Sequence, residues 1–134
     1  MVRYWAQEAL TKADLDLERL AVALPTVDPA TVAIRIASRW FRLFWAKGIT
    51  AVAMPWGIYA HPDRLEEPAA DFGRLVVHEL AHIDQWRRIG LIGWSRAYLG
   101  DYLRGRRAGL GHWGAYRSIG LEEEARDVAA RLGG

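Results

Sequence analysis

Residues 78–82 constrain this chain more than any other stretch, because they read H-E-L-A-H inside an apolar segment, FGRLVVHELAHIDQWRR. Two residues four positions apart on an α-helix lie one turn apart on the same face. On a helix, His78 and His82 can therefore both reach one metal ion, with Glu79 beside the open coordination position. The H-E-x-x-H pattern is typical of two zinc ligands and a general base. The sequence thus predicts a central helix, from about Ala69 to Gly90, that carries half of a metal site.

The chain length and composition predict one domain over residues 1–134, with enough apolar residues for a core. The chain has no cysteine, so any metal must be held by histidine, aspartate or glutamate. No run of eighteen uncharged apolar residues indicates a transmembrane helix. Glu8, Asp14 and Asp16 lie where a signal peptide needs an apolar core, which predicts a cytoplasmic protein. Seven tryptophans are expected to fill a small core.

Hydrophobic spacing predicts a mostly helical α+β fold with one short β-hairpin. Apolar residues recur at three- and four-residue steps in two N-terminal segments, and Asp28-Pro29 is typical of a helix start. Ile36, Trp40, Leu43 and Phe44 would form one apolar stripe on the second helix. The predicted helices are 3–24, 29–46, 69–90, 91–107, 112–119 and 121–132, and the predicted hairpin strands are 49–54 and 57–60.

A catalytic zinc usually has three protein ligands, so the third must come from elsewhere in the chain. A metzincin would have glycine and histidine three and six residues after the second ligand, where this chain has Gln85 and Arg88. The metzincin pattern is therefore excluded. His61 and His112 are the remaining histidines, and neither lies in a familiar metal-binding pattern.

The C-terminal segment LEEEARDVAARL gives a more specific match. H-E-L-A-H followed by E-x-E-A-x-x-x-A resembles the gluzincin class of zinc metallopeptidases, and most of all the short bacterial H-E-x-x-H domains known as minigluzincin-like. Those domains often carry glutamine or Gln-Trp after the second histidine, as residues 85–86 do here, and a tyrosine-bearing segment like 115–119. The resemblance covers roughly residue 49 to the C-terminus and implies a zincin-like fold, with a small sheet beside the active-site helix.

The resemblance also implies roles for particular residues. Glu122 would complete the zinc site with His78 and His82, and Tyr116 would stabilise the oxyanion. Glu123 and Glu124 remain competitors for the third ligand. Related enzymes place Asp or Asn four residues after the ligand glutamate, where this chain has Arg126. Two carboxylates could orient a ligand histidine instead: Asp84 and Asp101.

The resemblance predicts a zinc-dependent peptidase that acts on peptide or protein substrates. Glu79 would take the proton of a zinc-activated water and pass it to the leaving amine. One strand of the hairpin, 49–54 or 57–60, would receive the substrate as an added strand. The small size of the chain leaves one alternative, a zinc-bound interaction or regulatory module without turnover.

The positive charge of the chain is concentrated after the central helix. Seven arginines lie between residues 86 and 117, and Asp101 is the one acidic residue among them. A solvated helical face explains this block most simply, while weak binding of an anionic surface through residues 87–107 is an alternative. No nucleic-acid-binding motif accompanies it, so no specific nucleic-acid partner is expected.

Overall fold

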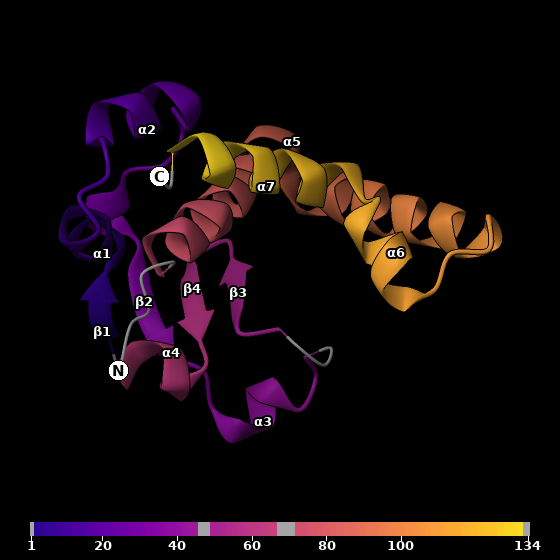
Figure 1. Cartoon of the computed structure of the whole chain (residues 1–134), viewed down its shortest axis with the longest axis horizontal. Coiled ribbons are helices and arrows are strands. Elements are labelled where there is room, and N and C mark those ends of the chain that lie inside the picture. Colours follow the sequence, from indigo (N-terminus) through magenta and orange to yellow (C-terminus); the bar gives the residue numbers. More distant parts are fainter. Residues whose placement is uncertain (1, 46–48, 67–71, 133–134) are drawn as a thin grey trace.

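The computed structural model describes residues 2–45, 49–66 and 72–132, and it has an α+β fold in which a small sheet lies against long helices (Figure 1). The sheet has the strand order β1-β2-β4-β3, with bounds β1 Val2–Trp5, β2 Ala33–Ile36, β3 Ala51–Met54 and β4 Gly57–Ala60. β2 and β4 are parallel, and the two outer pairs are antiparallel. The predicted fold class is confirmed.

The predicted hairpin is also confirmed. β3 and β4 pair in an antiparallel register that sets Ala53 opposite Ile58, with Pro55 and Trp56 in the turn between them. β4 has a partner strand on both sides, whereas β3 lies at the edge of the sheet. Of the two hairpin strands, only β3 is therefore open to an added strand within the described residues.

The single helix predicted over residues 3–24 is wrong. Residues 2–5 form β1, and two short helices follow, α1 (Ala6–Lys12) and α2 (Leu17–Ala23). Asp14 has a positive φ of 58°, which ends the first helix, and Asp16 accepts hydrogen bonds from the backbone of Glu18 and Arg19, which starts the second. Aspartate favours such turns and caps over a helix interior.

The helix predicted over residues 29–46 is wrong as well, and its last residue lies outside the described residues. Only the 3₁₀ turn η1 (Pro29–Thr31), β2 and the short α3 (Arg39–Arg42) occur there. The predicted cap is confirmed, since the Asp28 carboxylate accepts from the backbone of Ala30. β2 forms because Ile34 is buried against the core and pairs in register with Ile58 of β4.

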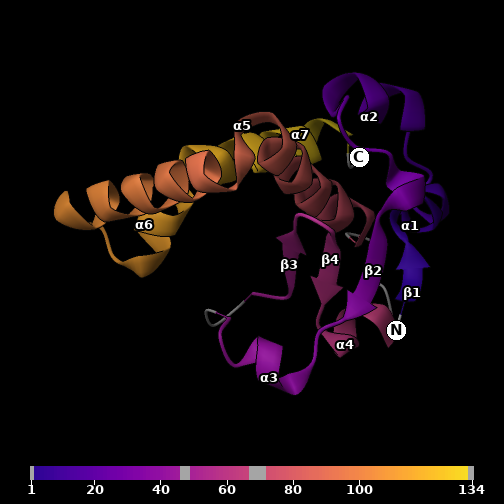
Figure 2. The same ribbon diagram turned by 180° about the vertical axis from the view of Figure 1, so that it is seen from behind.

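α5 (Phe72–Arg107) is two helical arms joined at Gly90, whose φ of 77° and ψ of 166° are not helical. The predicted boundary at Gly90 is confirmed, while the predicted start at Ala69 lies outside the described residues. The first arm crosses the sheet; the second projects away, and α7 runs back along it (Figures 1 and 2). The other helices are α4 (Pro62–Glu66), α6 (His112–Arg117) and α7 (Gly120–Leu132), and the last two were predicted. No helix of the described ranges is long and apolar enough to span a bilayer.

The core is aliphatic, and it fixes the first arm of α5 against the sheet and α1. Its largest fully buried side chains include Leu10, Ile34, Ile58, Leu80 and Ile83. At Gly73 an added Cβ would lie 2.5 Å from the Cβ of Ala13, so glycine permits the close approach of α5 to α1. The prediction that tryptophans fill the core is wrong, because none of the seven is buried. They surround the candidate site or lie at the surface instead.

Candidate metal centre

His78, His82 and Glu122 come together where the first arm of α5 meets α7. The Nε2 atom of His78 lies 3.2 Å from Oε2 of Glu122, and Nε2 of His82 lies 2.8 Å from Oε1. All three candidate ligand atoms lie within 4.8 Å of one another. His82 and Glu122 are buried, at 5% and 3% exposure, and His78 faces the solvent in part.

The competing ligands considered from the sequence lie elsewhere. Glu123 is exposed, and Glu124 pairs with Arg88, at 2.5 Å between its Oε1 and the Nη2 of Arg88. The ring of His61 accepts a hydrogen bond from Arg42 Nη1, at 2.8 Å, and His112 contacts the hydroxyl of Tyr102. Among the three acids at the start of α7, the structure brings only Glu122 to the histidines.

Gln85, which lies three residues after His82, orients this histidine. Its Oε1 lies 2.9 Å from Nδ1 of His82 and also accepts from Trp94 Nε1, while its Nε2 donates to the carbonyl of Leu121 and to Glu124. The two acceptors at Nε2 fix the amide orientation, so His82 Nδ1 must donate, and Nε2 is the nitrogen that can bind a metal ion once it loses its proton. The sequence offered Gln85 only as a detail of the resemblance, without a role.

Asp84 and Asp101 do not orient a ligand histidine, so that prediction is wrong. Asp84 accepts from the Thr26 hydroxyl and from Arg88 Nε, 2.7 Å away. Asp101 accepts from the backbone N–H of Gly120, at 3.0 Å, and thereby caps the start of α7. That backbone hydrogen bond, together with Arg104, lowers the pKa of Asp101. Both carboxylates serve the helices around the site rather than the site itself.

Two tyrosine hydroxyls donate to the Glu122 carboxylate. Tyr116, which was predicted to stabilise the oxyanion, lies 3.0 Å from Oε2 of Glu122, and Tyr98, which the sequence did not indicate, lies 3.4 Å from Oε1. Burial and then the charge of Glu122 raise the pKa of both phenols. Both therefore stay protonated and act as donors. The Tyr98 ring stacks on Trp94, which stacks on Trp86, so the second arm of α5 holds it in place.

The buried charges of the cluster are strongly coupled. Burial favours neutral Glu122, but hydrogen bonds from His78 and His82 outweigh it and hold the pKa of the carboxyl well below its usual range. Burial also opposes the charge on His82, yet the hydrogen bond and charge of Glu122 raise its pKa to about 9. Without a metal ion, the cluster is therefore a carboxylate held by a protonated imidazole.

Glu79 lies next to this cluster and is buried, at 6% exposure. Burial raises the pKa of its carboxyl, while the two histidines and a backbone hydrogen bond from Ala53 oppose the shift. Ala53 belongs to the edge strand β3. The acid between the two histidines thus faces both the cluster and the open edge of the sheet.

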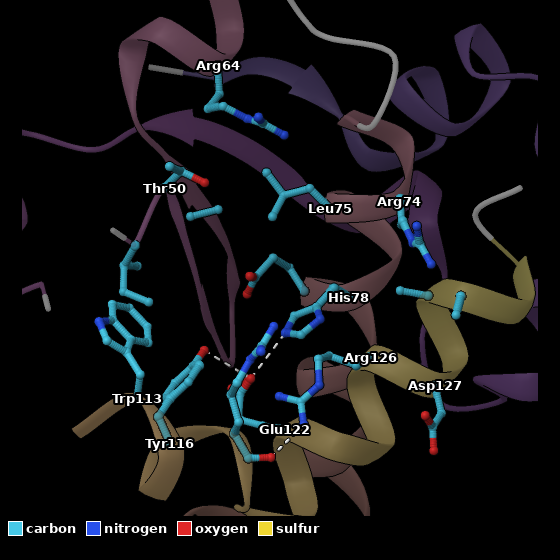
Figure 3. Close-up of a pocket in the computed structure, with 16 residues that line it drawn as sticks. Thr50, Arg64, Arg74, Leu75, His78, Trp113, Tyr116, Glu122, Arg126 and Asp127 are labelled. Atoms are coloured by element: carbon cyan, nitrogen blue, oxygen red, sulfur yellow. Dashed lines mark hydrogen bonds and ion pairs between the residues drawn. The ribbon is translucent and has the colours of Figure 1, made fainter. Parts of the chain in front are cut away.

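An open cleft of about 860 Å³ leads to the cluster, with His78, Glu79 and Glu122 among its lining residues. Trp113 and Tyr116 lie on one side of His78 and Glu122, and Arg74, Arg126 and Asp127 on the other (Figure 3). The remaining wall comes from β3 and the residues before it, from α4 and from α6, through Ile49, Thr50, Ala51, Arg64 and Arg117. The cleft can therefore admit an extended ligand rather than a single ion.

The donor set fits a zinc ion. Two imidazole nitrogens and a carboxylate are a common protein ligand set of catalytic zinc, and ligand atoms of a tetrahedral site lie about 3.3 Å apart. The nitrogen–oxygen distances here are 3.2 Å to Oε2 and 2.8 Å to Oε1 of Glu122, and one ligand atom from each of the three residues lies within 4.8 Å of the other two. The cleft reaches the cluster from the side of His78 and Glu79, where a fourth position for water or substrate would lie.

Comparison of the chain with protein-family models, with curated proteins and with solved structures found no match. The resemblance to gluzincins therefore stays a prediction from motifs. The geometry of the cluster and the cleft is therefore the basis for a function.

Proposed function

We propose that this protein is a zinc-dependent metallopeptidase in which His78, His82 and Glu122 hold the ion and Glu79 is the general base. One observation carries the proposal: a buried glutamate lies beside a His–His–Glu cluster that opens to a cleft of peptide size. A structural salt-bridge network would not need this acid or this cleft. A zinc ion held there would supply Lewis-acid chemistry, polarising a carbonyl and acidifying water.

The chain's own groups would perform the proton transfers and hold the substrate. Glu79 would accept a proton from the attacking water and deliver it to the leaving amine, and its raised pKa suits both steps. Tyr116 is a protonated donor at the cleft wall and would exchange its hydrogen bond to Glu122 for one to the developing oxyanion. Tyr98 would keep Glu122 in place.

The edge strand β3 would position the peptide. Its outer edge has no partner strand among the described residues, and Ala51 lines the cleft while the Ala53 backbone contacts Glu79. A substrate added as a further strand would have its backbone fixed by hydrogen bonds, next to the general base. This arrangement favours an extended peptide over a compact substrate.

The decisive experiment compares wild type with Glu79→Gln on a mixed peptide library, after zinc loading. Removal of a general base is expected to lower the rate of hydrolysis by about 10²–10⁴-fold, with zinc content and fold retained. Glu123→Gln removes an exposed glutamate near the same site and is expected to keep full activity. Undiminished hydrolysis by Glu79→Gln would contradict the proposed base.

The alternative is a zinc-bound module without turnover, which predicts that a protein group blocks the fourth coordination position. The cleft that reaches His78 and Glu79 favours the peptidase. Stoichiometric zinc binding without hydrolysis of any peptide in the library would favour the module.

A further inference from the structure

The short helix α3 and the turn after it expose three large apolar side chains. Trp40 is 77% exposed, Leu43 70% and Phe44 87%. We call these three residues the α3 patch. Contiguous large apolar side chains at the surface of a protein usually mark an interaction site. The sequence had placed them on one apolar stripe of a longer helix, which does not form.

The patch is held in place from behind by aromatic stacking. Phe41 stacks on Tyr59 of β4, with ring centroids 5.1 Å apart, and Trp45 packs edge-on against Phe41 at 5.7 Å. Phe41 and Trp45 thus anchor the segment on the sheet, while the α3 patch faces solvent. The exposure is therefore built into the fold rather than left by a fraying end.

The chain segment that carries the patch is basic, and the exposed Asp63 lies 3.5 Å from the ring of His61, the partner of Arg42. No acidic residue occurs between Asp28 and Asp63, whereas the basic residues in that interval are Arg35, Arg39, Arg42 and Lys47. Arg39 is exposed at the start of α3, next to Trp40. A partner of this surface must therefore accept apolar side chains and supply negative charge.

We propose that the α3 patch docks the protein on an anionic membrane surface, with the three apolar side chains inserted at headgroup depth. Tryptophan and other apolar side chains beside arginine or lysine are the usual composition of interfacial segments. A second copy is a poorer occupant, because a symmetric contact would bring the arginines of two patches together. Charge complementarity thus favours a lipid surface.

Docking would also place the cleft near the membrane. Arg42 of α3 donates to His61, at 2.8 Å, and the His61 backbone N–H donates to the carbonyl of Thr50, also at 2.8 Å. Thr50 lines the cleft. The helix α3 and the cleft wall are therefore linked by two hydrogen bonds, although the docking proposal does not depend on peptidase activity.

The test is co-sedimentation of the full chain with phosphatidylcholine vesicles, with and without about one third phosphatidylglycerol. We expect wild type to bind the anionic vesicles, and the triple variant W40S/L43S/F44S to lose at least about tenfold in partitioning. The matched control V22S/I92S/L99S removes three other exposed apolar side chains, at 84%, 76% and 57% exposure, and is expected to bind like wild type.

A second measurement keeps the proposal testable if the triple variant does not fold. Brominated lipids are expected to quench the tryptophan emission of wild type, and Trp40→Phe is expected to lose most of that quenching. Three results would each overturn the proposal. Wild type could bind neutral vesicles equally well, wild type could fail to bind any vesicle, or the control could lose binding instead of the patch variant. Wild type could also self-associate without binding vesicles, and the patch variant could abolish that self-association. This result would overturn membrane docking and would make a second copy of the chain the partner of the patch.

Discussion

Gln85 is fully buried, and three of its four polar contacts run to His82 or to the helix that carries Glu122, while the fourth runs to Trp94 in the second arm of α5. Gln85→Leu would leave Nδ1 of His82 without its acceptor. Loss of such a partner typically lowers metal affinity by about 10–100-fold. We expect competition with a chelator to show this loss of zinc affinity in Gln85→Leu. Gln85→Glu keeps an acceptor and should retain more of the zinc affinity.

The control for this prediction is Gln7→Leu, because Gln7 is exposed on α1 and is the other glutamine of the chain. It should bind zinc like wild type. Equal zinc affinity of wild type and Gln85→Leu would show that Gln85 fills space rather than orienting His82.

The raised pKa of His82 predicts opposite pH trends for the metal-free and zinc-loaded protein. The folded pKa of about 9 lies above the ordinary 6.5, so protonation of His82 stabilises the metal-free fold below pH 6.5, and this stability is lost as the pH rises through 9. Zinc must displace the same proton, so its affinity rises over that interval. Thermal unfolding tests both trends between pH 6.5 and 9. The Tm of the metal-free protein should fall as the pH rises, and the increase in Tm that zinc causes should become larger.

His112→Gln is the matched control for the pH trends, since His112 is exposed and lies away from the cluster. It should reproduce both, whereas His82→Gln should flatten the metal-free trend. A metal-free Tm that rises across this interval in wild type would contradict the His82–Glu122 pairing.

At the scale of single residues, the sequence predicted which side chains meet at the candidate metal centre. The four-residue step of His78 and His82 and the E-x-E-A segment sufficed to select the cluster that the structure brings together. Gln85 and Tyr98 were missed as functional residues because their roles depend on contacts across helices. The site of Tyr98 in particular requires the bend at Gly90, which no short motif encodes.

At the scale of elements, Gly90 sets the angle between the two arms of α5. Its φ of 77° lies where residues with a side chain are strained, yet an added Cβ would meet no atom within 4 Å. Gly90→Ala should therefore cost backbone strain alone, about 1–3 kcal/mol in the free energy of unfolding. Because the second arm carries Trp94 and Tyr98, zinc affinity should fall as well.

Gly100→Ala is the matched control for Gly90, because Gly100 also has open space around an added Cβ but lies in the second arm without a positive φ. Alanine there should be neutral or stabilising. Urea unfolding and zinc titration of both variants test the difference. Equal stability of the two would mean that the bend carries no strain cost.

The elements that sequence reasoning missed are those whose identity depends on distant partners. Leu10, Leu20 and Leu24 are buried, so their helical spacing was a correct sign of burial, but two short helices satisfy it as well as one long helix. β2 needs β4 as its parallel neighbour, twenty-four residues further along in register. Local propensity cannot report such a pairing.

At the scale of the whole molecule, the cleft is assembled from the sheet edge, the first two turns of α5, and residues of α4, α6 and α7. Apart from the cluster residues and Glu79, its charged lining residues are Arg64, Arg74, Arg117, Arg126 and Asp127. Arg74 lies one turn before His78 on α5, and Arg126 lies one turn after Glu122 on α7. The cationic side of the cleft thus flanks the position where a scissile bond would lie.

This lining predicts a preference for acidic peptides, on the premise that the protein is a peptidase. A glutamate near the scissile bond should raise kcat/KM by about tenfold over glutamine at the same position, and the advantage should shrink with ionic strength because solvent-exposed charges are screened. Matched fluorogenic peptides that differ in this one residue, assayed from low to high salt, measure both effects.

Arg74→Gln should reduce the preference, whereas Arg106→Gln, at an exposed arginine outside the cleft, should leave it unchanged. Equal cleavage of both peptides at every salt concentration would refute the acidic preference and leave the peptidase intact. If the zinc-loaded protein cleaves neither peptide and no peptide of a wider library, the result would count against the peptidase itself. The two failures differ because the arginines would act on the approach and placement of the substrate, whereas Glu79 and the cluster would act on the bond that breaks.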